Sequence, residues 1–257
     1  MHRPEFERIA GHANVRPRPM MRPGRALLVA ALALGFGVVA RAAADDAHSG
    51  VSEPLPLPMR VVAAGKLHFS KSGDGCPGIA ARCEERSYLL PGDTVVMTSL
   101  HGQWADAVFT GGPPKFRSTE GWLPRAALRP IPIGHLQPAD WYGNWHSGDQ
   151  QEIDIAPVHG NLVRVRGLAT WGGDDPARIA DGDVNLGAFD TTLPLTAATM
   201  VFAPALNGGP AVLNPQDPSA CVIHMHLLGS YLLASGNTNC GGANVTFDGA
   251  YRHAPRN

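Results

Sequence analysis

The stretch from Cys221 to Ala234, Cys-Val-Ile-His-Met-His-Leu-Leu-Gly-Ser-Tyr-Leu-Leu-Ala, decides the fold class of this chain. Its first half alternates with a period of two, which is typical of a half-buried β-strand. One face carries Cys221, Ile223, Met225 and Leu227, and the other carries Val222, His224 and His226. Gly229-Ser230 is a two-residue turn with glycine first, as type II′ hairpins prefer. The stretch therefore predicts an antiparallel hairpin.

Other segments of the same half repeat this period. Ile153 and Ile155 alternate with acidic residues, Val163 and Val165 alternate with arginines, and a last strand is expected over 244–252. No stretch after Ala44 shows a helical period. An antiparallel meander of six to eight strands over 135–254, closed or nearly closed into a barrel or sandwich, would bury these faces without a long free edge.

The preceding part, residues 59–129, also predicts short strands joined by turns. Pro91-Gly92-Asp93 opens the strand 94–98, and His101-Gly102 turns the chain into 103–109, where Trp104, Ala107 and Phe109 are the expected packing residues. Prolines 130 and 132 then forbid a helix and interrupt a sheet ladder. We expect a linker at 130–134 between two β domains, so the predicted fold class is all-β.

The first domain resembles the bacterial SH3-type domains. The resemblance rests on Leu90-Pro91-Gly92-Asp93-Thr94-Val95, a tryptophan in the next strand, and Gly121-Trp122-Leu123-Pro124 with a trailing Leu128. It covers about 70 residues and implies an SH3-like barrel. The insert from Lys71 to Arg86 departs from the family pattern and carries two cysteines.

Two further resemblances lie in the second domain. Trp141-Tyr142-Gly143-Asn144-Trp145 is similar to the Gly-x-Trp opening of lipocalin-type barrels. The segment from Cys240 to Arg252 resembles the C-terminal tail of small disulfide-stapled periplasmic β domains, some of them in proteins linked to lysozyme inhibition. The second resemblance implies an envelope-facing binding domain and supplies no ligand.

The N-terminal region predicts export. A basic start at Met20–Arg25, an apolar run of 15 residues at Ala26–Ala40 and small residues up to Ala44 follow the order of a secretory signal peptide. A bilayer-spanning helix needs about 20 apolar residues. We therefore expect cleavage near Ala44 and a periplasmic or secreted protein. Residues 1–19 read as an extension from a start codon assigned too early, and 45–58 as a proline-rich lead.

Four cysteines remain after this signal, and an even number in an oxidising compartment predicts disulfides. Three pairings are possible, and the local one, Cys76 with Cys83 and Cys221 with Cys240, keeps each bridge within one domain. Zinc is disfavoured because the spacings lack the short knuckles that its ligands usually need.

The charge of the exported part disfavours several partner classes. Residues 1–44 hold seven of the 21 Lys and Arg and two of the 22 Asp and Glu, so the rest carries 14 against 20, a net charge of −6. Nucleic acid would want a basic face, and the three lysines form no polybasic membrane patch. An acidic surface suits a cationic partner, although solubility alone also explains it.

Catalytic and metal sites find little support. The chain has no Gly-x-Ser-x-Gly elbow, its cysteines are expected to pair, and its acidic pairs lie in loop-like sequence. His224 and His226 have a spacing that a metal can use, but no third ligand follows nearby, and an outward polar stripe explains them equally. The segment 180–192 fails the calcium-loop pattern. We expect no enzyme, metal or cofactor.

Aromatic side chains are the remaining candidates for binding. Trp104, Trp122 and Phe69 are expected to line a groove for peptide or glycan, although core packing is the simpler role for any one of them. The favoured function is non-catalytic binding of peptidoglycan or a wall-associated protein, by analogy with exported SH3-type modules. The alternatives are inhibition of a lysozyme-type enzyme by an exposed loop, and carriage of a small apolar ligand inside the second barrel.

Overall fold

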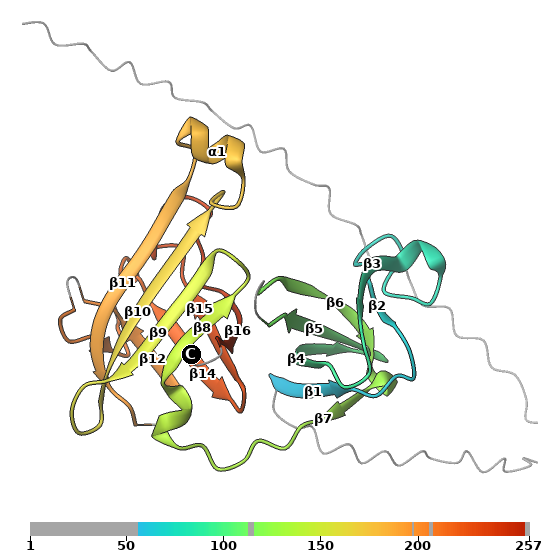
Figure 1. Cartoon of the computed structure of the whole chain (residues 1–257), viewed down its shortest axis with the longest axis horizontal. Helices are drawn as coiled ribbons and strands as arrows, with labels where there is room; N and C mark the ends of the chain where they lie inside the picture. Colours follow the sequence, from blue (N-terminus) through green and yellow to red (C-terminus); the bar gives the residue numbers. More distant parts are fainter. Residues whose placement is uncertain (1–55, 113–115, 197, 206–207, 255–257) are drawn as a thin grey trace, which may run out of the picture. The chain divides into compact units, whose positions relative to one another are not determined.

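The computed structural model describes residues 56–112, 116–196, 198–205 and 208–254. Within them it confirms the all-β class, with two antiparallel sheets and one short α-helix, α1 (Pro176–Asp181) (Figure 1). The predicted signal segment 20–44, residues 1–19 and most of the proline-rich lead lie outside the described residues. Among the described helices, none is long and apolar enough to cross a membrane.

The first sheet has seven strands in the order β3-β2-β6-β5-β4-β1-β7. Its core holds inward residues from all seven strands, including Phe69, Leu89, Val95 and Leu123. The strands are β1 (Leu57–Val61), β2 (Leu67–Ser70), β3 (Glu84–Leu89), β4 (Thr94–His101), β5 (Trp104–Thr110), β6 (Ser118–Pro124) and β7 (Leu128–Pro130). Two 3-10 turns, Ala81–Cys83 and Arg125–Ala127, lie between them.

The second sheet has nine strands in the order β11-β10-β9-β8-β16-β15-β14-β12-β13. A 3-10 turn at Pro138–Trp141 precedes it. The strands are β8 (Gly143–Ser147), β9 (Gln151–Pro157), β10 (Leu162–Trp171), β11 (Asn185–Pro194), β12 (Thr199–Ala203), β13 (Val212–Leu213), β14 (Ile223–Leu228), β15 (Tyr231–Gly236) and β16 (Gly249–His253). The C-terminal strand β16 thus lies in the middle of the sheet, between β8 and β15.

A short segment nearly closes this sheet into a barrel. Residues 208–211, which lead into β13, bond to the edge strand β11: Gly208 N–H donates to the Asp190 carbonyl, Thr192 N–H to Gly209, and Ala211 N–H to Thr192, all within 2.9 Å. Since these bonds satisfy backbone groups of β11, that strand is not a bare edge.

The interior of the second sheet is filled by core side chains. The alternation predicted for the Cys221–Ala234 hairpin holds, because Ile223, Met225 and Leu227 are almost fully buried. Leu228 and Tyr231 flank a two-residue turn in which Gly229 has a φ of +63°, a value that favours glycine. The largest buried side chains in this core include Trp145, Phe202, Phe247 and Tyr251.

One predicted strand begins later than expected. The alternation from Asn244 buries Val245 and Phe247, yet β16 starts only at Gly249. Asn244 has a left-handed φ of +65°, which ends any extended run there. The side chain of Thr246 accepts from the Asp248 N–H at 2.9 Å, a local bond that replaces a ladder bond.

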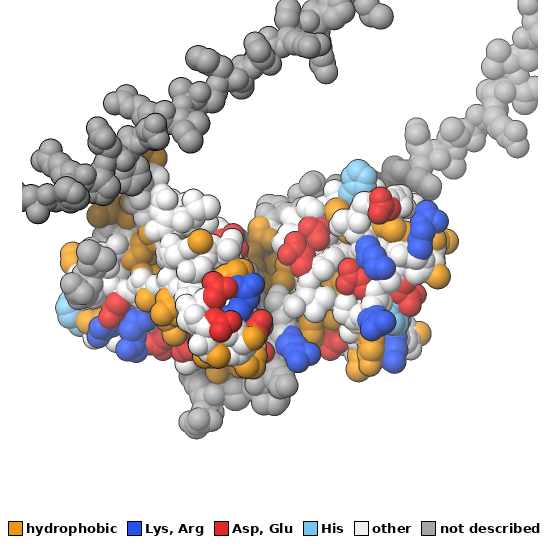
Figure 2. Space-filling model, turned by 90° about the horizontal axis from the view of Figure 1, so that it is seen from above, with side chains coloured by type: hydrophobic (Ala, Val, Ile, Leu, Met, Phe, Trp, Pro, Cys, Tyr) orange, Lys and Arg blue, Asp and Glu red, His pale blue; other side chains and the backbone are white. Residues whose placement is uncertain are grey.

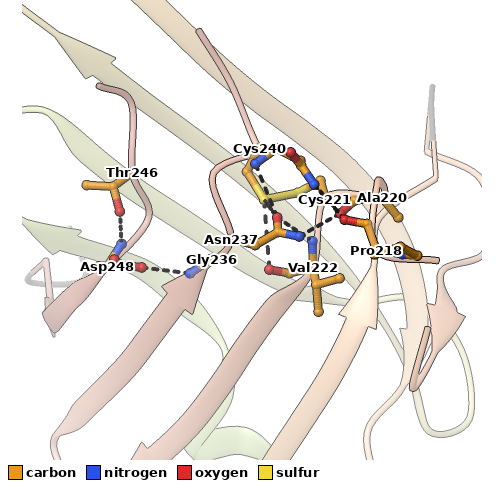
Figure 3. The surroundings of a disulfide bond; sticks show 10 residues. Pro218, Ala220, Cys221, Val222, Gly236, Asn237, Cys240, Thr246 and Asp248 are labelled. Carbon is orange, nitrogen blue, oxygen red and sulfur yellow. Dashed lines mark hydrogen bonds between the residues drawn. A yellow bond between two sulfur atoms is a disulfide. The ribbon is translucent and has the colours of Figure 1, made fainter. Parts of the chain in front are cut away.

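Both cysteine pairs expected from local pairing are formed, Cys76 with Cys83 and Cys221 with Cys240. Two disulfides indicate an oxidising, exported environment. Figure 3 shows the second bridge, which joins the segment just before β14 to the loop after β15. Asn237 supports it, because its side-chain oxygen accepts from the Val222 N–H at 3.1 Å and its amide donates to the Ala220 carbonyl at 2.7 Å.

Candidate functional site

Trp104 and Trp122 lie on the same face of two neighbouring strands. In the register of β5 and β6, Trp104 is opposite Pro124 and Trp122 is opposite Asp106, so the two tryptophans are diagonal neighbours. Both are half-buried. Trp104 does not share a face with the buried Ala107, because residues three positions apart on a strand point to opposite sides of the sheet.

Two polar contacts fix Trp122 in place. Its indole N–H donates to the Ser72 hydroxyl at 2.8 Å. The His101 ring lies edge-on to the indole, with the ring centroids 6.2 Å apart. A half-exposed indole held in this way loses little conformational freedom when it binds a ligand. We call Trp104, Trp122 and His101 the aromatic face.

Phe69 does not belong to this face. Its side chain is only 1% exposed and packs in the core of the first sheet. The expectation that Phe69 contacts a ligand is therefore wrong. On β2 the polar neighbour His68 points outward instead, and its Nδ1 lies 2.9 Å from the Glu85 carbonyl.

The aromatic face continues along the sheet toward residues that contact the second sheet. Val108 lies opposite Glu120 and next to Val96 in the ladder, and Glu120 shares its strand face with Trp122. Val96 is fully buried with Leu228, Tyr231 and Ala250, and Val108 packs against this cluster. The outward side chains of one sheet thus meet those of the other within the compact unit Gly50–Asn257.

Hydrogen bonds accompany this apolar contact. The Tyr231 hydroxyl donates to the Thr94 carbonyl at 2.6 Å, and Thr110 donates its hydroxyl to the Ala250 carbonyl. Arg252 also donates to the Thr110 carbonyl at 3.4 Å. Burial raises the pKa of Tyr231 above its ordinary value, so the hydroxyl keeps the proton that it donates.

A cavity of about 520 Å³ opens beside this contact, and we call it the inter-sheet groove. Such a volume lies within the range of roughly 300–1,000 Å³ that small-ligand sites occupy. Residues of both sheets line it. From the first sheet and the residue before it come Pro56, Thr98, Val108, Ser118 and Glu120. From the second come Ser147, Gln151, Thr199, His224, Met225, His226, Leu233, Ala234, Ser235, Asp248, Gly249 and Ala250.

The ionisable groups of the groove come from both walls. His224 and His226 are successive outward residues of β14, as the period of two predicted. Desolvation by burial lowers the pKa of His226 below its ordinary value. Glu120 is exposed on the other wall, and Asp248 accepts from the Gly236 N–H at 2.7 Å. None of the described residues forms a group of three or more side chains suited to a metal ion.

The groove and its acidic residues have no signature in the sequence. Glu120 precedes Gly121-Trp122 without any motif of its own, and the groove exists only because two sheets meet. The pairing of His224 and His226 on one face was visible in the alternation, but their facing wall was not.

Charged side chains of both signs lie close together on part of the described surface. On the face drawn in Figure 2, acidic and basic side chains are interspersed over the described residues. On β9 to β11, Arg164 pairs with Asp190 and Arg166 with Asp154. The Arg164 guanidinium, by hydrogen bond, holds the pKa of Asp190 below its ordinary value. These pairs neutralise one another and offer no unpaired patch to a polyanion.

No family model, curated protein or solved structure matches this chain. Its function must therefore be inferred from the aromatic face, the inter-sheet groove and the two disulfides.

Proposed function

We propose that this protein is an exported, non-catalytic binding protein of the bacterial cell envelope, with peptidoglycan as its ligand. The observation that carries the proposal is the aromatic face, in which Trp104 and Trp122 lie on one side of adjacent strands and remain half-exposed. Flat indole rings on a rigid sheet are suited to stack on sugar rings or on apolar side chains of a wall peptide.

Other features support export and binding. The disulfides agree with an oxidising compartment, and the segment 20–44 has the layout of a Sec-type signal with cleavage near Ala44. The resemblance of residues 59–129 to SH3-type domains points toward wall binding by analogy. The same reasoning leaves a wall-associated protein as the other ligand that this face could accept.

The test is a pelleting assay with purified peptidoglycan sacculi. The chain from residue 45 onward, which contains the whole compact unit, is expected to sediment with sacculi. The variants Trp104→Ala and Trp122→Ala are each expected to weaken the affinity for sacculi by about tenfold, the effect of losing one stacking contact of about 1.4 kcal/mol. Trp171→Ala is the matched control, because Trp171 lies in the second sheet with Arg178 over its ring.

If the unaltered protein stays in the supernatant, peptidoglycan binding is wrong. If it pellets and both variants pellet equally well, the ligand binds elsewhere and the aromatic face is not the site.

Inhibition of a lysozyme-type enzyme is a second candidate, favoured by the β10–β11 connection. This loop carries helix α1, and Asp174, Asp175, Asp181 and Asp183 are all exposed on it. Ile179 is 55% exposed between them. Arg178 pairs with Asp175 and Asp183, so Asp174 and Asp181 are the carboxylates beside Ile179 that would complement the cleft of a cationic enzyme. Stoichiometric slowing of lysozyme that weakens with added salt would support this candidate.

Carriage of a small apolar ligand inside the second barrel has no comparable support. The interior of the described sheet is filled by side chains such as Trp145, Phe189, Phe202 and Phe247. We therefore do not propose it.

A further inference from the structure

The inter-sheet groove is a second candidate ligand site, because none of its lining residues belongs to the aromatic face. Ala250, Val108 and Leu233 line the groove and also pack in the buried cluster with Val96, Leu228 and Tyr231. The hydrogen bonds from Tyr231 to Thr94 and from Thr110 to Ala250 hold the two walls together. The groove is therefore preformed, and a ligand entering it would not have to order its walls.

The groove combines apolar surface with both kinds of ionisable group. Val108 and Leu233 supply half-buried apolar side chains from opposite walls. His224 and His226 stand on β14, and Glu120 stands on β6. Neither imidazole nor the Glu120 carboxylate has a hydrogen bond or ion pair to another residue in the described part of the chain. No other described residue therefore competes with a ligand for these three side chains.

This set of groups discriminates among ligand classes. The carboxylates of Glu120 and Asp248 would repel a polyanion. A neutral sugar would offer the ionisable groups no charged partner. A short peptide with a free carboxylate and a free amine answers both: imidazole N–H groups donate to its carboxylate, and Glu120 accepts from its amine. The hydroxyls of Thr98, Ser118 and Ser235 suit its amide groups.

We propose that the inter-sheet groove binds the stem peptide of peptidoglycan, a short peptide with free amine and carboxylate groups, while the aromatic face contacts the adjoining part of the ligand. The inference rests on the proposed function and names the part of the ligand that this second site takes. Continuity supports it, because Glu120 in the groove and Trp122 in the aromatic face share one side of β6.

The experiment uses two fractions of one amidase digest of sacculi, the free stem peptides and the peptide-free glycan strands. Each is titrated by calorimetry into the chain from residue 45 onward. We expect the stem peptides to bind and His224→Gln, His226→Gln and Glu120→Gln each to weaken that binding by about tenfold, the loss of one charge-assisted hydrogen bond. His159→Gln, an exposed histidine in the β9–β10 turn, is the matched control and should change nothing.

A second measurement guards against variants that perturb the fold. In the unaltered protein, the imidazole NMR signals of His224 and His226 are expected to shift on addition of stem peptides, and that of His159 is not.

The outcomes separate the two proposals. If the protein pellets with sacculi but only the glycan fraction binds, the groove inference is overturned and wall binding stands. If stem peptides bind without affecting the groove histidines in either measurement, the groove is likewise excluded. If the protein neither pellets nor binds either fraction, both proposals fall.

Discussion

Tyr231 and Thr94 are 137 residues apart in the chain and share two hydrogen-bond contacts. The Tyr231 hydroxyl donates to the Thr94 carbonyl at 2.6 Å and lies 2.7 Å from the Thr94 hydroxyl, which can donate back to it. Tyr231 is completely buried, on the side of β15 that faces away from the barrel core. Tyr231 points away from the core of its own sheet and is buried in the contact between the two sheets.

Replacing this tyrosine tests how much the contact contributes. Tyr231→Phe keeps the ring but leaves the Thr94 carbonyl without its donor, so the free energy of unfolding is expected to fall by about 1–2 kcal/mol. Thermal unfolding would show this as a midpoint lowered by roughly 2–4 °C for each kcal/mol. Tyr88→Phe, at an exposed position, is the control. Equal midpoints for both variants would mean that the hydrogen bonds contribute nothing.

Gly167 is the second test, since its place opposite Phe189 in the β10–β11 ladder leaves no room for a side chain. A Cβ at Gly167 would overlap the Phe189 ring. Gly167→Ala is therefore expected to force that ring to move and to cost about 1–3 kcal/mol in urea unfolding. Gly65→Ala, where a Cβ meets nothing within 4 Å, should be nearly neutral. A neutral Gly167→Ala would show that Phe189 relocates freely.

A third prediction concerns pH. Burial lowers the folded-state pKa of His226 below the unfolded value of 6.5. Between these two values the unfolded chain binds more protons, so stability falls as the pH drops from about 6.5 through the folded pKa. His226→Gln should flatten this part of the stability profile, measured by urea unfolding at a series of pH values. Its register partners Thr199 and Leu233 carry no charge, whereas His224, Glu120 and Asp248 share its groove.

The control for this profile is His159→Gln, which should leave it unchanged. A steeper pH dependence in His226→Gln than in the unaltered protein would contradict the expected loss of stability through protonation of His226.

The fourth prediction compares the two disulfides. The bridge between Cys221 and Cys240 closes 19 residues, for which chain-entropy reasoning gives about 3 kcal/mol of stabilisation. The bridge between Cys76 and Cys83 closes only seven and restricts the unfolded chain less. The double variant Cys221→Ala/Cys240→Ala is expected to lose more stability in urea unfolding than Cys76→Ala/Cys83→Ala. The reverse order would point to native-state contacts within the shorter loop as the larger effect.

The sequence predicted the structure correctly where a local residue pattern is compatible with a single backbone arrangement. The alternation around Met225 predicted a buried face, and glycine at 229 predicted the turn. The sequence-based prediction was wrong where the structure depends on a contact that the hydrophobic pattern does not reveal. Phe69 and Trp122 are both aromatic strand residues, and only the assembled sheet decides that Phe69 points inward. The start of β16 was misplaced because the Thr246 hydroxyl offers the backbone a local partner, which hydrophobic period alone does not register.

The inter-sheet groove could not be predicted from the sequence either. Its walls come from different sheets, with Glu120 on β6 and His224 on β14, and the pattern along β14 marks His224 as outward without showing which residues lie opposite. Leu228 and Tyr231 also look like ordinary hairpin residues in the sequence. They are buried on the outer side of the barrel because residues of the first sheet cover them.

The position of β16 has a consequence for the order of assembly. Because the last strand lies between β8 and β15, pairing Arg252 with both His146 and Tyr231, the nine-stranded sheet has a gap at its centre until residues 249–253 arrive. Until then, β8 and β15 each lack the neighbour that β16 provides. A chain that stops before Gly249 would therefore leave β8 and β15 as two open edges.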